Sequence, residues 1–199
     1  MSGVQMCKNM FCRCFSGSNG VGDYVSMNDQ PLVVLDTSKM GLDVVIVKNG
    51  HRLCGTGAAL ANAPIVQNKA YFETKLQQSG IWGVGLATLK ADLNRVPLGR
   101  DAESWVLCSD GTLMHNGEVV HKLSTLPMEG DVIGLSYDHV ELNFYLNGKN
   151  METPLTSAKG ELYPVLYVDD GAILDAVFSL FFYPPPPGYD RILIEKSLL

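Results

Sequence analysis

One segment indicates the fold class of this chain most clearly: Gly130-Asp-Val-Ile-Gly-Leu-Ser-Tyr-Asp-His-Val-Glu-Leu-Asn-Phe-Tyr-Leu-Asn-Gly-Lys149. Apolar side chains occupy every second position of its latter half, at Leu142, Phe144 and Leu146. Residues 132–137 alternate in the same way, and a period of two places such side chains on one face of a β-strand. Asn147-Gly148 then supplies the positive φ angles that a type I′ hairpin turn requires. We therefore predict an antiparallel sheet with a buried face, to which Phe144 contributes.

Further short strand signals follow one another at a spacing near ten residues. They lie at 32–35, 44–47, 52–54, 71–76, 81–87, 105–108, 112–115, 118–122, 162–168 and 173–178. Asn49-Gly50 and Asn116-Gly117 mark two more hairpin turns, and residues 55–64 are small and are expected to be flexible. No stretch shows a convincing helical period. This pattern predicts an all-β sandwich or barrel.

The length of 199 residues suits a single β-rich domain, which we place at 31–199, preceded by a flexible tail over 1–30. The formal net charge of −6 and the absence of a cluster of Lys and Arg argue against binding to nucleic acid. No run of about 18 apolar residues is present, so we expect no transmembrane helix.

Three of the five cysteines, Cys7, Cys12 and Cys14, lie close together near the start of the chain. An odd number of cysteines favours reduced thiols and a cytoplasmic protein over a disulfide framework. Cysteines beside basic and bulky apolar residues are candidates for acylation, which would permit peripheral contact with a membrane. A metal site, or a disordered tail with inert thiols, are the alternatives.

Several blocks of the chain resemble SPRY domains. Residues 71–76 (Tyr-Phe-Glu-Thr-Lys-Leu) and 81–87 (Ile-Trp-Gly-Val-Gly-Leu-Ala) are similar to the early paired strands of that family. Residues 130–138, 142–148 and 162–166 are similar to its later blocks. The resemblance implies a bent, concanavalin-like sandwich of two antiparallel sheets with few or no helices. It also implies recognition of a short peptide segment of a partner protein through loops at one rim.

The same resemblance points to two rim loops as the partner-binding site. The first comprises Asp169, Asp170 and Gly171, with Tyr167 just before it. The second comprises Val96, Pro97, Leu98, Arg100 and Asp101. Because some SPRY adaptors have Val-Trp-Gly where this chain has two aspartates before the glycine, we expect a different target, with Lys or Arg in the partner segment.

Motifs of catalysis are missing from the sequence. There is no Gly-x-Ser-x-Gly elbow, and the four histidines do not have the spacing of a zinc hydrolase. The glycines at 80–85 are followed by strand-forming residues, whereas a nucleotide loop opens a helix. We therefore expect no catalytic residue, no cofactor and no metal ion in a non-enzymatic binding module. A lectin-like sandwich that binds carbohydrate, or a membrane scaffold anchored through acylated cysteines, are the alternatives.

The proline-rich run 184–189 has two interpretations. A polyproline helix is a ligand for SH3 and WW grooves when it is exposed. We favour a strap that covers a sheet edge, because the apolar residues 192–194 follow as if the chain returns to the core.

Overall fold

The computed structural model describes residues 32–194, which form fourteen β-strands and no helix. The strands are β1 (Leu35–Met40), β2 (Asp43–Val47), β3 (Arg52–Ala61), β4 (Ala70–Gln78), β5 (Ile81–Ala87), β6 (Ser104–Cys108), β7 (Thr112–His115), β8 (Glu118–Lys122), β9 (Val132–Tyr137), β10 (Leu142–Leu146), β11 (Lys149–Asn150), β12 (Tyr163–Asp169), β13 (Ile173–Val177) and β14 (Asp190–Arg191). The prediction of an all-β, mainly antiparallel fold is confirmed.

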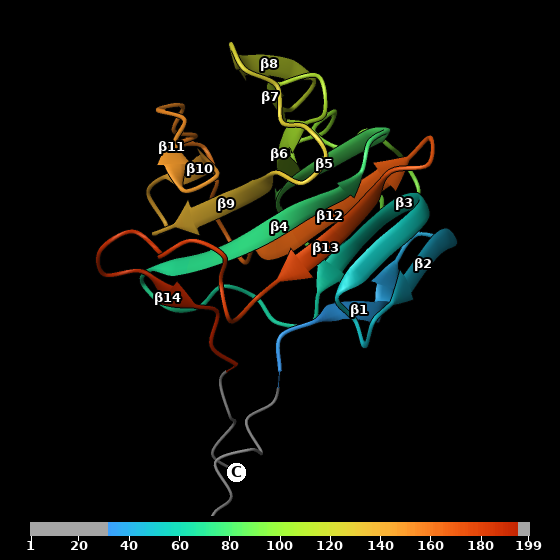
Figure 1. The fold of residues 1–199 in the computed structure, drawn as a ribbon, viewed down its shortest axis with the longest axis horizontal. Coiled ribbons are helices and arrows are strands. Elements are labelled where there is room, and N and C mark those ends of the chain that lie inside the picture. The colour runs from blue at the N-terminus through green and yellow to red at the C-terminus, as the bar shows by residue number, and fades with distance from the viewer. Residues whose placement is uncertain (1–31, 195–199) are drawn as a thin grey trace, which may run out of the picture. The chain divides into compact units, whose positions relative to one another are not determined.

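The strands join into one curled sheet with the order β11-β10-β9-β4-β13-β3-β12-β5-β6-β7-β8 (Figure 1). β1 and β2 also pair with β3, and β14 runs parallel to the start of β4. The two separate sheets of the predicted sandwich are not confirmed, because β3 belongs to both parts. Its first residues pair with β13 (Leu53 with Leu174), and its last residues pair with β12 (Ala59 with Leu166).

Glycines inside β3 explain this continuity. Gly55 and Gly57 have φ angles of +93° and +129°, which L side chains rarely adopt. A Cβ atom at Gly55 would lie 2.3 Å from the carbonyl oxygen of Asp43 on β2, so the close approach of the two strands also requires glycine. The expectation of a flexible segment over 55–64 is therefore wrong for most of its length, because residues 55–61 belong to β3.

The hairpin that indicated the fold forms as predicted. β9 and β10 are antiparallel, with Phe144 opposite Leu135, and the Phe144 side chain is 0 % exposed. Asn147 and Gly148 have φ angles of +50° and +78°, as a type I′ turn requires.

The first strand differs from the prediction. The apolar run at 32–35 was expected to end at the polar residues that follow, whereas β1 starts at Leu35 and continues to Met40. The Asp36 carboxylate accepts hydrogen bonds from the Ser38 amide (2.8 Å) and hydroxyl (2.7 Å), and the register with β3 shifts between Leu35 and Met40. The predicted end of the strand is thus an irregularity within it.

Apolar side chains form two clusters. The larger one fills the inside of the curled sheet and includes Phe144, Leu135 and Trp82. The smaller one lies on the opposite face of the strands around β12, where residues of the irregular segment 88–103 pack on Tyr167.

The proline-rich run returns to the sheet as the strap interpretation expects, but it meets β4, which lies between β9 and β13 and is not an edge strand. Before it, the amides of Phe182 and Tyr183 donate hydrogen bonds to the carboxylate of Glu73 on β4. After it, β14 pairs with the start of β4, and the Ile192 side chain returns to the larger cluster.

Candidate functional site

One end of the sheet carries a line of aspartates around an exposed isoleucine, which we name the acidic row. Asp43 on β2 lies opposite Thr56 on β3, whose hydroxyl donates a 3.0 Å hydrogen bond to Asp169 at the end of β12. Asp169 in turn lies opposite Ile81, the first residue of β5. Directly opposite residues of neighbouring strands present their side chains on the same face. The Ile81 side chain is 41 % exposed, which leaves an apolar contact among the carboxylates.

Asp110 extends the acidic row onto the next strand pair. It lies two residues beyond Cys108, which pairs with Gly83 of β5, so it is adjacent to Ile81 at the same end of the sheet. Its carboxylate accepts hydrogen bonds from the Thr112 amide (3.0 Å) and hydroxyl (2.6 Å). Burial raises the pKa of Asp110, but these hydrogen bonds outweigh it and hold the pKa below its ordinary value.

The Asp169 loop is fixed by its own hydrogen bonds. The Asp169 carboxylate accepts from the Asp170 amide (2.8 Å) as well as from Thr56, and its carbonyl accepts from the Ala172 amide (3.1 Å). Asp170 and Gly171 both have positive φ angles, +48° and +79°, and both are exposed. Asp170 thus projects its charge from a rigid turn.

Tyr167 supports this surface from beneath. Its side chain is 1 % exposed, and its ring covers Gly83, where an added Cβ atom would lie 2.1 Å away. Burial raises the pKa of Tyr167, and the neighbouring Cys108 thiol adds to the shift. Burial likewise raises the pKa of the Cys108 thiol, which makes it a poor nucleophile. Tyr167, which the sequence analysis placed among the partner contacts, therefore has almost no exposed side chain with which to make one.

The predicted loop at 96–101 packs on the same cluster. Leu98 is 2 % exposed, and Val96, joined to Pro97 by a cis peptide bond, is half-buried against Tyr167 and its neighbours. The Asp101 carboxylate accepts hydrogen bonds from the Glu103 amide (3.0 Å) and the Ser104 hydroxyl (3.3 Å). Arg100 is exposed.

The structure thus brings the two predicted loops onto one small cluster. It adds Asp43, Thr56, Ile81 and Asp110, which the sequence analysis did not select. The only sequence signal for these residues was their position at the ends of predicted strands. Which strand ends lie together depends on the sheet order, which the local pattern does not contain.

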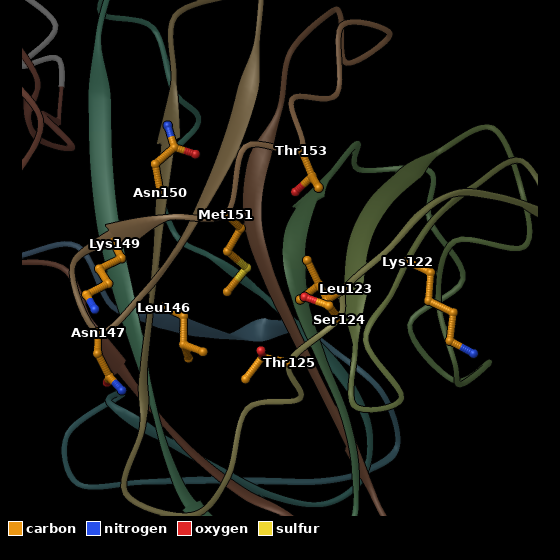
Figure 2. Close-up of a pocket in the computed structure, with 10 residues that line it drawn as sticks. All are labelled: Lys122, Leu123, Ser124, Thr125, Leu146, Asn147, Lys149, Asn150, Met151 and Thr153. Carbon is orange, nitrogen blue, oxygen red and sulfur yellow. The ribbon is translucent and has the colours of Figure 1, made fainter.

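A separate cleft lies between residues 122–125 and 146–153 (Figure 2). Its volume is about 570 Å³, and no carboxylate is among the ten side chains that line it. They are Lys122, Leu123, Ser124, Thr125, Leu146, Asn147, Lys149, Asn150, Met151 and Thr153.

Neither a metal centre nor a membrane span is found over residues 32–194. No group of three or more His, Cys, Asp or Glu side chains there is arranged to hold a metal ion, the acidic row included. Within the same range, no helix is long and apolar enough to cross a membrane. The candidate acylation sites Cys7, Cys12 and Cys14 lie outside the described residues.

Comparison with known proteins identifies the class. The SPRY domain family model matches residues 69–181, and the chain belongs to this family. It is 54 % identical to SPRY domain-containing protein 7 of Gallus gallus over 195 residues, which cover 97 % of this chain and 100 % of that protein.

Solved SPRY structures share the fold. The TRIM65 PSpry domain superposes with a TM-score of 0.60 at 17 % identity, covering 74 % of this chain and 90 % of that one. The SPRY domain of human HERC1 gives a TM-score of 0.59 at 20 % identity, with coverages of 72 % and 96 %. SPRY domains are commonly protein-interaction modules.

Proposed function

We propose that this protein is a non-enzymatic module that binds a short peptide segment of a partner through the acidic row and the adjoining rim loops. The segment carries Lys or Arg side chains that meet Asp169, Asp170 and Asp110, and an apolar side chain that meets Ile81. The observation that carries the proposal is the exposed isoleucine placed among aspartates of neighbouring strands.

The rigidity of the rim supports this proposal. Loops on a fixed scaffold lose little conformational entropy when they bind, because their ends are already held. Here Asp169 is tied to Thr56 on β3, and the 96–101 loop is anchored through Leu98. Exposed carboxylates contribute mainly to the association rate and to the choice of partner, and their effect weakens as salt is added.

The test is a selection of short peptides from a random displayed library on the purified protein. We expect enrichment of peptides that combine Lys or Arg with an apolar residue. The affinity of the best peptide for wild type and for Asp169→Asn/Asp170→Asn is then compared by fluorescence anisotropy. The double variant should bind roughly tenfold more weakly, since each exposed ion pair contributes about 0.2–1 kcal/mol.

Asparagine is the appropriate substitute, because it keeps a hydrogen-bond acceptor at 169 and tolerates the positive φ angle at 170. The matched control is Glu152→Gln, an exposed acid outside the acidic row that also has a positive φ angle. Peptides without basic residues, or equal affinity for the wild type and the double variant, would refute the proposed site.

The alternative of carbohydrate binding would need an exposed aromatic ring on which a sugar can stack. Neither tryptophan can serve, because Trp82 and Trp105 are both buried. A cytoplasmic location, with or without acylation at Cys7, Cys12 and Cys14, is compatible with peptide binding. Fractionation of a triple Cys→Ser variant tests that part separately.

A further inference from the structure

The cleft lined by Lys122 and Lys149 lies where the two ends of the sheet meet. β8 and β11 are the terminal strands of the sheet order. One wall of the cleft is formed by the end of β8 and the residues after it, 122–125. The other wall is formed by the β10–β11 hairpin and its continuation, 146–153. The curled sheet does not close through strand pairing here, and the cleft occupies the gap.

Three apolar side chains, Leu123, Leu146 and Met151, lie among polar ones in the lining of the cleft. Leu123 and Met151 are half-buried against the larger cluster and approach the middle of the cleft from opposite walls (Figure 2). Hydroxyl groups of Ser124, Thr125 and Thr153 lie among them. The Thr153 hydroxyl oxygen is buried without a hydrogen-bond partner. An unsatisfied buried hydroxyl has a free-energy cost that a ligand with a polar group can remove.

The ionisable side chains that line the cleft are two lysines, whereas Glu152, the acid within the 146–153 wall, is exposed and is not among the lining residues. Lys122 and Lys149 are exposed and lie at opposite sides of it (Figure 2). Neither forms an ion pair within 4 Å among residues 32–194, although Lys122 lies near Asp110 and helps to lower the pKa of that carboxyl. The nearby carboxylate of Asp131 is occupied by hydrogen bonds from the Met128 amide and the Asn147 side chain. A chain with a net charge of −6 therefore has a cleft whose ionisable groups are both cationic.

We propose that this cleft binds an extended segment of a partner protein in which acidic residues flank an apolar side chain. The apolar side chain lies over Leu123 and Met151, and the acidic residues meet Lys122 and Lys149. A volume of about 570 Å³ suits a few residues of an extended chain. The inference rests on the proposed role as an interaction module, but it assigns a second site of opposite charge to the acidic row.

The experiment uses three pools of fluorescein-labelled peptides of equal length, each with a central Leu, Ile or Met flanked by acidic, neutral or basic residues. Binding to the full-length protein is followed by anisotropy. We expect the acidic pool to bind the cleft more tightly than the neutral pool. Lys122→Glu/Lys149→Glu should weaken its binding about tenfold or more, because both contacts become repulsive.

The matched control is Lys90→Glu/Lys159→Glu, which makes the same charge change at exposed lysines outside the cleft. The proposal is overturned if the acidic pool binds no better than the neutral pool, or if the control variant loses as much affinity as the cleft variant. If the cleft variant shows no cooperative melting transition, Lys122→Gln/Lys149→Gln replaces it, with a smaller loss of the same sign expected.

Asp169→Asn/Asp170→Asn separates the two sites. This variant should weaken the basic pool and leave the acidic pool unchanged. If the acidic row is not a binding site, the basic pool will bind the wild type and this variant equally, and the result for the cleft will be unaffected. If the cleft is not a binding site, the acidic pool will show no preference over the neutral pool, and the result for the acidic row will be unaffected.

Discussion

Tyr167 and Asp169 show how single residues build the acidic row. They are two positions apart on β12 and therefore share a face of the strand. Tyr167 is covered by the 96–101 loop, whereas Asp169 lies where the strand leaves that cover. The Tyr167 ring is held by its packing in the smaller cluster, and the Asp169 carboxylate is held by the hydrogen bond from the Thr56 hydroxyl. A resemblance alone could not separate these supporting and exposed roles.

Phe144 provides the sharpest residue-scale test of the buried face. Phe144→Ala should lower the free energy of unfolding by about 3–5 kcal/mol, because a fully buried ring is replaced by a cavity. Urea denaturation measures the change. The control is Asn143→Ala, the neighbouring half-buried residue on the other face of β10, which should cost about 1 kcal/mol or less. Equal costs at the two positions would contradict the assignment of faces.

At the scale of elements, the C-terminal strap depends on one buried carboxylate. Glu73 is 0 % exposed on β4 and accepts hydrogen bonds from the amides of Phe182 (2.7 Å) and Tyr183 (3.0 Å) and from the Tyr71 hydroxyl (3.0 Å). The strap has no regular strand pairing until β14. These bonds therefore position the run of prolines against the sheet.

Glu73→Gln should loosen this strap. The amide group of Gln replaces one accepting oxygen with a donor that faces the backbone N–H groups, so we expect a cost of about 1–3 kcal/mol. Hydrogen exchange should accelerate over 178–191 more than in β9 and β10. The control is Glu129→Gln, which changes an exposed carboxylate that accepts only from the Ser79 amide. Unchanged exchange in the strap would contradict the role of Glu73.

Elements with local signals were predicted well from the sequence. The Asn-Gly turns at 49–50, 116–117 and 147–148 all adopt positive φ angles, because that conformation is a property of the residues themselves. The continuity of β3, the acidic row and the contacts of Glu73 were not predictable. They depend on pairings between segments more than a hundred residues apart, such as β3 with β12. Local alternation fixes which face a residue occupies but not its neighbour on the next strand.

For the whole molecule, charge is distributed unevenly around the sheet. The acidic row lies at the ends of β12 and β5, whereas the lysine cleft lies between β8 and β11. The two proposed sites use different residues and opposite charges, which would let one molecule bind two segments at once.

Asp175 belongs to neither surface and has a structural role. Its carboxylate accepts two hydrogen bonds from Arg52 (2.5 and 2.8 Å) and one from Lys48 (3.3 Å).

The stability of the whole molecule should depend on pH at both extremes. Burial raises the pKa values of Asp110, Asp138 and Asp175, but their hydrogen bonds outweigh it, so the folded-state values are depressed. Their stabilisation is therefore complete above the unfolded value of about 3.9 and is lost as the pH falls through the folded values.

Burial and a neighbouring carboxylate raise the pKa values of Tyr163 and Tyr189 to about 12, so the unfolded chain releases these protons first. Stability should then fall again between a pH of about 10 and 12. Urea denaturation across the pH range measures both limbs, and Asp175→Asn should flatten the acid limb without changing the alkaline one. A free energy of unfolding that stays constant from neutral pH down to a pH of about 2 would contradict this account.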